Sequence, residues 1–121
     1  MENELQDFIQ SSFKSIWALE LMLFLKRNPE RAWAAEDLVR ELRGSAPVVA
    51  QSAAALQFAG LVAEDSDHAI RYLPASPALG ALADSLEHAY QEKPNAVRRL
   101  ILSAPNEKLR TLADAFRLRK E

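Results

Sequence analysis

Glycine and proline residues divide this sequence into short segments, and that division limits the fold to small helices and hairpins. Only 3 glycines and 6 prolines occur among the 121 residues. Apolar side chains recur every three or four positions from residue 5 to residue 27, which is typical of a helix. Pro29 ends this stretch, because proline disfavours helical backbone in the residue before it. We therefore predict one helix here, or two with a bend near Ser11 and Ser12.

Two more helices should follow, each with its own start and stop signals. Residues 35–42 have an acidic first turn that suits the helix dipole, and Gly44 is placed to end this segment. Ser45 can cap a third helix over residues 46–59. Gly60 should close that helix, because glycine adopts left-handed backbone without steric cost.

A small hairpin and further helices complete the expected order. Residues 61–63 and 70–73 favour strands, and the polar residues between them favour a turn. A fourth helix should begin at residues 76–77, where serine can cap it and proline suits its first turn. Pro94 interrupts that helix, and a last apolar stripe covers residues 109–116. The predicted fold class is therefore mainly α with a small β-hairpin.

The net charge of −2 conceals an uneven distribution along the chain. Residues 1–92 carry 7 Lys and Arg against 14 Asp and Glu, whereas residues 93–121 carry 8 against 3. An acidic body is thus joined to a basic tail, which bears on the partners of this chain more than the total does.

Composition disfavours secreted and membrane-spanning proteins. The chain has 0 cysteines, which excludes disulfides and thiolate zinc sites and fits a reducing cytoplasm. No apolar run approaches the roughly 20 residues that a bilayer-spanning helix needs. The acidic N-terminus is also unlike a signal peptide. We expect a soluble, cytoplasmic protein that does not contact membranes.

No pattern of residues predicts catalysis, a cofactor or a bound metal. His68 and His88 belong to different predicted elements, and their spacing matches no known set of metal ligands. A solvated turn and a helix surface explain them better. Asp84 and Glu87 lie one helical turn apart, but nothing indicates a cleft around them. We expect no enzyme, no cofactor and no metal site.

The order helix, helix, glycine turn, helix, hairpin resembles the winged helix-turn-helix superfamily, especially the MarR-like transcriptional regulators. The resemblance covers about residues 12–73 and is most specific at residues 56–62, which read LQFAGLV. That segment is similar to the L-x-x-x-G-L-V junction at which such a recognition helix turns into the wing. In this chain Leu56 would pack inward and Gly60 would leave the helix with left-handed backbone. A helical bundle with a chance Gly-Leu-Val is the alternative.

The resemblance implies three parts and a role in transcription control. Residues 1–11 would form an N-terminal helical extension, residues 12–76 the winged helix-turn-helix domain, and residues 77–121 a C-terminal helical extension. The extensions look like the dimerisation elements common in this superfamily, so a homodimer is expected. Trp17 and Trp33 could line an effector pocket of the kind MarR-like proteins have, although core positions suit them better.

The third predicted helix departs from the pattern of proteins that bind DNA. Residues 44–63 contain no charged side chain, and residues 33–73 carry three basic against six acidic ones. Base recognition relies largely on Arg, Lys, Asn and Gln, and phosphate contacts usually dominate affinity. An uncharged outward face suits a protein partner better than a nucleic acid. The residues predicted to form that partner-binding face are Val48, Gln51, Ala54, Ala55 and Phe58.

Three functional hypotheses remain open. The third, an enzyme or a metal protein, would need a cleft that the sequence does not reveal, and each of the first two has a plainer alternative. In the first, a protein partner binds the uncharged face, unless flanking helices bury it. In the second, a dimeric regulator contacts DNA phosphates through Arg71 and its basic C-terminal helices. Arg71 could instead pair with Glu64 across the hairpin, and the tail arginines could be solvated or neutralise a partner subunit. The residues available to DNA would be Gln51, Arg71, Arg98, Arg99, Arg110 and Arg117.

Overall fold

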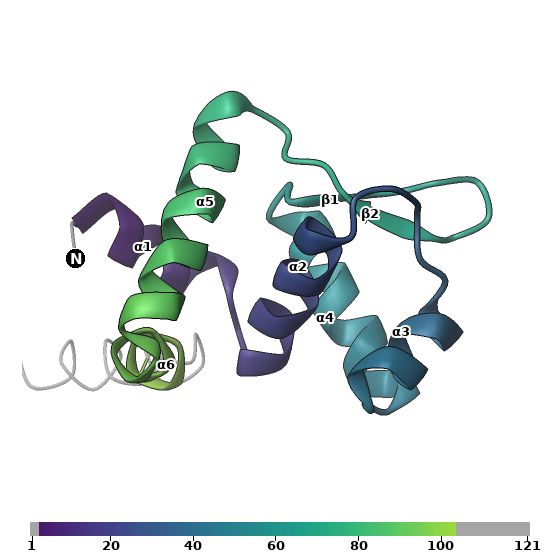
Figure 1. Ribbon diagram of the computed structural model, residues 1–121, viewed down its shortest axis with the longest axis horizontal. Helices are drawn as coiled ribbons and strands as arrows, with labels where there is room; N and C mark the ends of the chain where they lie inside the picture. The colour runs from purple at the N-terminus through teal and green to yellow at the C-terminus, as the bar shows by residue number, and fades with distance from the viewer. Residues whose placement is uncertain (1–2, 104–121) are drawn as a thin grey trace, which may run out of the picture.

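The computed structural model describes residues 3–103, which form six helices and one antiparallel hairpin (Figure 1). The described chain is mainly helical with a small two-stranded sheet, as the sequence predicts. The stripe predicted at residues 109–116 lies outside the described residues. The elements in chain order are α1 (Asn3–Ser12), α2 (Ile16–Arg27), α3 (Ala35–Leu42), α4 (Ala46–Phe58), β1 (Val62–Glu64), β2 (Ile70–Tyr72), α5 (Pro77–Glu92) and α6 (Pro94–Ser103).

The first apolar stretch forms two helices, α1 and α2, and the chain bends by 104° between them. The bend follows Ser12, where the sequence allowed one. The Ser15 hydroxyl caps α2 by accepting a hydrogen bond from the Ala18 backbone N–H at 3.2 Å. Phe13 lies at the corner, fully buried, and its ring packs edge-on against the Phe8 ring with centroids 5.7 Å apart.

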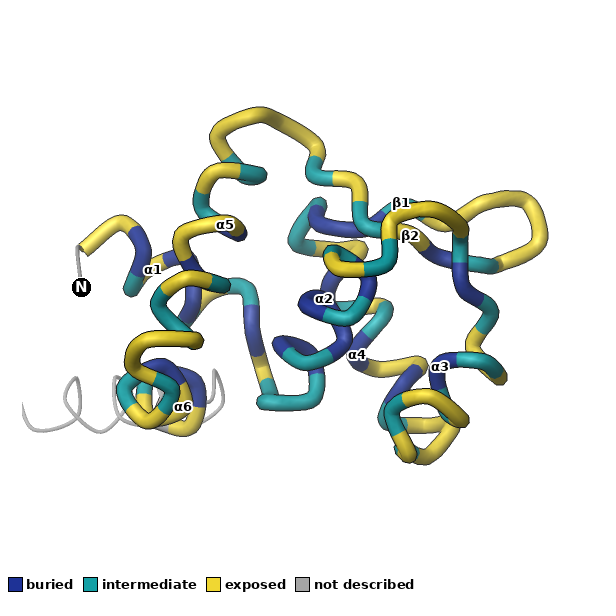
Figure 2. Tube along the Cα trace, in the orientation of Figure 1, coloured by how far each residue is buried: buried dark blue, intermediate teal, exposed yellow. Residues whose placement is uncertain are grey.

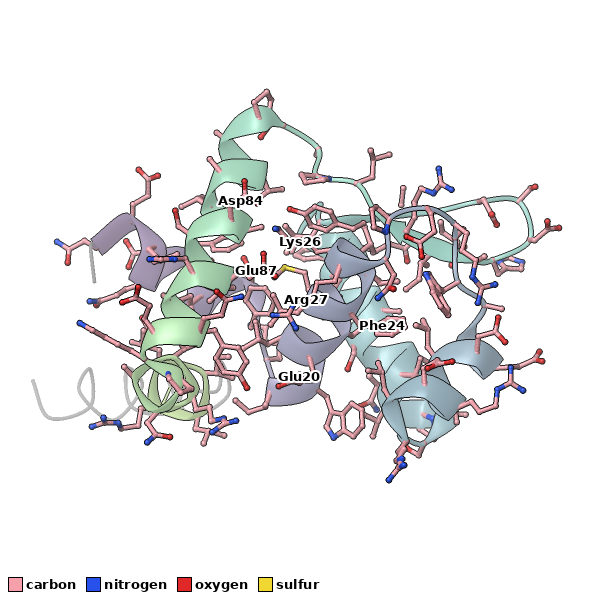
Figure 3. All side chains as sticks on the ribbon, in the orientation of Figure 1. Glu20, Phe24, Lys26, Arg27, Asp84 and Glu87 are labelled. Atoms are coloured by element: carbon pink, nitrogen blue, oxygen red, sulfur yellow. The ribbon has the colours of Figure 1, made fainter. Side chains whose placement is uncertain are left out.

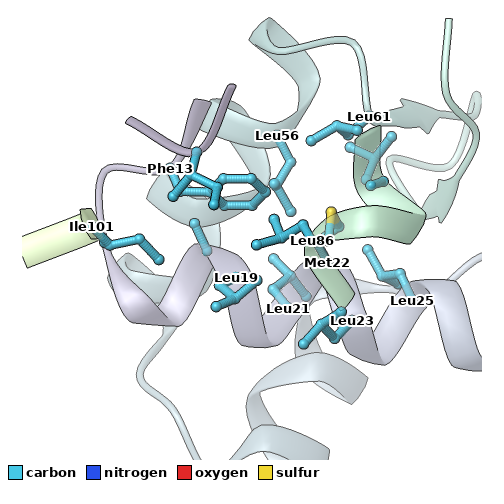
Figure 4. Packing of buried hydrophobic residues seen from close by; sticks show 14 of the residues in the cluster. Phe13, Leu19, Leu21, Met22, Leu23, Leu25, Leu56, Leu61, Leu86 and Ile101 are labelled. Carbon is cyan, nitrogen blue, oxygen red and sulfur yellow. The ribbon is translucent and has the colours of Figure 1, made fainter. Parts of the chain in front are cut away.

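Helix α2 is the centre of the molecule. Helices α1, α5 and α6 lie on one side of it, and α3, α4 and the hairpin lie on the other (Figure 1). The buried apolar side chains of both sides form one continuous cluster, part of which Figure 4 shows. The buried residues of α2 are Ala18, Leu19, Leu21, Met22, Leu23 and Leu25.

The hairpin is tied to the link that precedes α3. Trp33 and Ile70 exchange two backbone hydrogen bonds, of 2.7 and 2.9 Å, beside the strand pair. Trp33 is buried, and its indole N–H donates to the Asn28 carbonyl at 3.2 Å. The interpretation of this tryptophan as a core residue is therefore confirmed.

The alternative in which Arg71 pairs with Glu64 across the hairpin is wrong. The register places Arg71 opposite Ala63, and Glu64 opposite Ile70. Successive strand residues point to opposite faces, so Arg71 and Glu64 lie on different faces of the hairpin. Glu64 instead pairs with His68 inside the turn, with 3.1 Å between Oε1 and Nδ1.

Gly60 and Gly44, which follow the ends of α4 and α3, have different structural roles. Gly60 leaves α4 with φ of +80°, as predicted, and a Cβ there would also lie 3.3 Å from the Leu79 side chain. At the end of α3 the left-handed residue is Arg43, with φ of 55°, rather than Gly44. Gly44 is required for packing instead, because a Cβ there would lie 3.1 Å from the Trp17 ring.

Candidate functional site

Helix α4 packs on α2, α3 and β1 through one side only. The Ser45 hydroxyl caps its start by accepting from the Val48 N–H at 3.3 Å, as predicted. Val49, Ser52 and Leu56, which the helical spacing directs inward, are all buried. This side of the helix therefore packs in the core.

The predicted outward face is open to solvent over most of its length. Gln51, Ala54 and Phe58 are exposed, whereas Val48 and Ala55 are half-buried at the edges of the face. Phe58 has 96% of its surface exposed, so no segment among residues 3–103 covers it. The alternative in which flanking helices bury this phenylalanine is therefore wrong for the described chain.

The exposed surface of α4 is wider than the sequence analysis predicted. Pro47, Ala50 and Gln57 are exposed as well. The spacing of three and four residues that found the inward positions would also have found these. The "α4 face" is hereafter the exposed, uncharged stripe of Pro47, Ala50, Gln51, Ala54, Gln57 and Phe58.

The half of the molecule that contains α4 carries more acidic than basic residues. On α3, Glu36 and Glu41 are exposed, while Asp37 accepts from Arg40 and lies 3.6 Å from the Arg31 guanidinium. The six acidic and three basic residues between positions 33 and 73 give this half of the molecule a charge of −3.

Three of these six acidic residues lie in the hairpin, at positions 64, 65 and 67. The Asp65 carboxylate accepts from the backbone N–H groups of Asp67 and Ala69 at 2.9 and 3.0 Å, which orders the turn. Asp67 and His68 are exposed at the tip, and Figure 2 shows the whole loop open to solvent. An acidic loop repels a phosphate backbone.

The described basic residues proposed for DNA binding lie in two separate places, the hairpin and α6. Arg71 is exposed on the hairpin and makes no ion pair within the described chain. Arg99 is exposed on α6, on the other side of α2 (Figure 1). Arg98 is exposed but already engaged, because it donates to the Tyr90 hydroxyl at 3.2 Å. Of the remaining candidates, Gln51 lies on the α4 face, and Arg110 and Arg117 lie outside the described residues.

A polar cluster that the sequence analysis missed joins α2 to α5 (Figure 3). Lys26 Nζ lies 2.9 Å from Asp84 Oδ1 and 2.6 Å from Glu87 Oε1. Arg27 donates to the second Glu87 oxygen at 2.9 Å. Asp84 and Glu87 therefore form ion pairs rather than an acid–base pair. Their partners are about 60 positions away in the chain, so no local sequence signal could have revealed them.

Hydrogen bonding and burial set the ionisation of this cluster. The hydrogen bond from Lys26 lowers the pKa of Glu87 below its ordinary 4.5, against the effect of burial. Burial opposes the charge of Lys26, but its hydrogen bonds to Glu87 and Asp84 outweigh burial and raise its pKa. The Tyr72 hydroxyl is buried without a hydrogen-bond partner among the described residues, and burial raises its pKa.

Two open hollows lie on the surface. One, of about 550 Å³, is lined by Leu5 of α1 and by Asp84, His88 and Glu92 of α5, so the expectation that no cleft lies beside Asp84 is wrong. His88 and Glu92 pair with each other at 3.2 Å. The other, of about 320 Å³, is lined by Ile16, Trp17, Glu20 and Leu42. Trp17 is half-buried there rather than a full core residue, so the sequence interpretation holds for only one of the two tryptophans.

Within residues 3–103 no three His, Asp or Glu side chains lie close enough to hold a metal ion. In the same part of the chain no single helix is long and apolar enough to cross a membrane. Helices α1 and α2 together reach that length and apolar content, but the chain bends by 104° between them.

Comparison of the chain with protein-family models, with curated proteins and with solved structures gives no match. The function is therefore argued from the residues and their geometry.

Proposed function

We propose that this chain is a winged helix-turn-helix protein that acts in transcription control by binding a protein partner through the α4 face. The order α2, α3, α4 and hairpin supports the fold assignment. Further support comes from the left-handed Gly60 at the junction between α4 and β1 and from the Leu56 side chain buried one turn before it. Helices α1, α5 and α6 are then the extensions of that domain.

The observation that carries the proposal is the exposure of Phe58. Burying a phenylalanine side chain is worth roughly 1.5–3 kcal/mol, and this one is 96% exposed. It ends a stripe without charge that runs the length of α4. Aromatic anchors set in a patch depleted of charge are typical of protein interfaces.

The charges around the α4 face favour a protein over a nucleic acid. Proteins gain most of their non-specific affinity for DNA from lysine and arginine contacts to phosphates. The α4 face has no such residue, and the hairpin turn in the same half of the molecule is acidic. A duplex placed against α4 would therefore gain little and would be repelled at the turn.

Direct DNA binding is a second candidate, and Arg71 is the specific observation in its favour. This arginine is exposed on the hairpin and makes no ion pair with the described residues. Arg99 is also exposed, but it lies on the far side of α2. A dimer would have to bring the arginines of two copies to one duplex.

Two measurements on the full chain test these candidates. Immobilised wild-type protein should capture a partner from a cell extract, and Phe58→Asp should lose it while keeping its melting temperature. Ala81→Asp, at an exposed position of α5, is the matched control and should retain the partner. Equal capture by both variants would contradict the proposal. Salt-dependent binding to mixed DNA duplexes that Arg71→Glu abolishes would favour the second candidate.

A further inference from the structure

The α4 face needs a partner that is both apolar and basic. The face itself offers Phe58 at one end, Pro47 at the other, and alanine and glutamine side chains between them. It lies in the half of the molecule that carries a charge of −3. Complementary charge steers association and disfavours wrong partners, so an apolar surface with a basic rim would fit best.

The chain contains such a segment in residues 104–121, which follow the described part. The sequence there carries five basic residues against three acidic ones. Its apolar residues, Leu109, Leu112, Ala113 and Phe116, recur at spacings of three or four or directly follow one another, so one side of the segment can be apolar. The segment therefore matches the α4 face in both polarity and charge.

The length of this segment also suits the α4 face. The 13 residues of α4 extend over about 20 Å at about 1.5 Å per residue. Even at that compact spacing, the 18 residues from 104 to 121 could span about 27 Å. The segment is thus long enough to cover the whole face.

The arrangement of the helices favours a second copy as the source of the segment. Helix α6, after which the segment begins, packs on α1, α5 and α2, whereas α4 packs on α2, α3 and β1. The two helices lie on different sides of α2 (Figure 1). A chain's own segment would have to pass around α2, whereas that of another copy can approach the open face directly.

We infer that residues 104–121 of one copy bind the α4 face of a second copy, and that the exchange is reciprocal. The inference rests on the proposed function, because it identifies a second copy of this chain as a protein that binds the α4 face. A reciprocal exchange closes the assembly as a two-fold dimer and covers both faces, so no binding surface is left to propagate. Another protein that binds the α4 face would then compete with the segment.

The absence of cysteine from the chain allows a direct cross-linking test on the full-length protein. Two single variants, Ala54→Cys and Ala113→Cys, are mixed and treated with a short bis-maleimide. We expect a covalent heterodimer of the two variants. Mixing Ala81→Cys with Ala113→Cys is the control and should give none, because residue 81 is exposed on α5, away from α4.

Sedimentation velocity gives an independent measurement. Phe58→Glu and Phe116→Glu should each weaken dimerisation roughly thirtyfold, the factor that corresponds to losing an interface anchor of about 2 kcal/mol. Ala81→Glu adds the same charge elsewhere and should leave the dimer intact. Since Phe58 is almost fully exposed, its substitution should not unfold the chain.

Other outcomes would overturn the inference. A wild-type chain that is monomeric and gives no cross-links would contradict it. A cross-link that forms only within single chains of an Ala54→Cys/Ala113→Cys double variant would also contradict it, because the chain's own segment would then be the occupant. In either case, loss of a captured protein in Phe58→Asp would leave the proposed function standing. A dimer that persists in Phe58→Glu would place the interface elsewhere.

Discussion

Helices α4 and α5 lie on opposite sides of α2 and contact it through different chemistry. Helix α5 contributes Leu86 to the shared apolar core, but it also makes charged and polar contacts with α2. Asp84 and Glu87 lie on Lys26, and the Tyr90 hydroxyl donates to Glu20 at 2.7 Å. Helix α4 is joined to α2 by buried apolar residues such as Val49 and Leu56. The polar side chains of α5 therefore have partners inside the molecule, whereas the α4 face has none among the described residues. That difference is the reason to seek a partner for α4.

The largest expected change in stability distinguishes the buried side of α4 from its exposed side. Leu56→Ala should lower the free energy of unfolding by about 2–5 kcal/mol, because it leaves a cavity in the core. Phe58→Ala, two residues further on, should change it by no more than about 0.5 kcal/mol when both proteins are measured as monomers, because the fold of the single chain leaves Phe58 exposed. Denaturant titration of both variants measures the difference. Similar losses at the two positions would mean that Phe58 is packed in solution.

A smaller effect is expected where α4 turns into the hairpin. Gly60→Val should destabilise the protein by more than about 1 kcal/mol, since a β-branched residue is strained at φ of +80°. Gly80→Ala in α5 is the control. A Cβ there meets only ordinary contacts, and alanine favours helix, so its melting temperature should hold or rise. An unchanged melting temperature in Gly60→Val would remove the strained turn from this account.

The polar attachment of α5 should depend on pH. The pKa of Glu87 is lowered in the folded chain, so its ion pair with Lys26 stabilises fully above pH 4.5 and less as the pH falls through the folded pKa. Glu87→Gln should therefore cost about 1 kcal/mol near pH 7 and progressively less in acid. Denaturant titrations at several pH values test this. If the difference in unfolding free energy between wild type and Glu87→Gln stays constant down to pH 3, the ion pair does not contribute to stability.

The smallest effect on stability is expected at Arg71. Its side chain is exposed and makes no ion pair in the described chain, so Arg71→Glu should change the free energy of unfolding by no more than about 0.5 kcal/mol. Under the protein-partner proposal it should also leave partner capture unchanged. Loss of a captured protein in this variant would extend the interface from α4 to the hairpin.

Most of the fold could be predicted from local signals. Serine caps, helix-ending residues and apolar spacing placed α3, α4 and the start of α5 at or within one residue of their observed bounds. The inward side of α4 followed from the same spacing. Each of these features depends on residues fewer than five positions apart, which a single sequence displays.

Features that depend on distant residues could not be predicted. The ion pairs of Lys26 join positions about 60 residues apart, and nothing local marks them. The pairing of Arg71 was wrong because a shift of one residue in strand register moves a side chain to the other face. Arg43, rather than Gly44, takes the left-handed position at the end of α3, and the close approach of Gly44 to the Trp17 ring joins positions 27 residues apart.

Photo-cross-linking in living cells shows directly whether the α4 face binds protein. A photoreactive amino acid replaces Gln51 in the full chain, with the same replacement at Ala81 as the control. We predict adducts to protein at position 51 that Phe58→Asp abolishes, and none of these adducts at position 81. Adducts to nucleic acid alone, or protein adducts that persist in Phe58→Asp, would contradict the account.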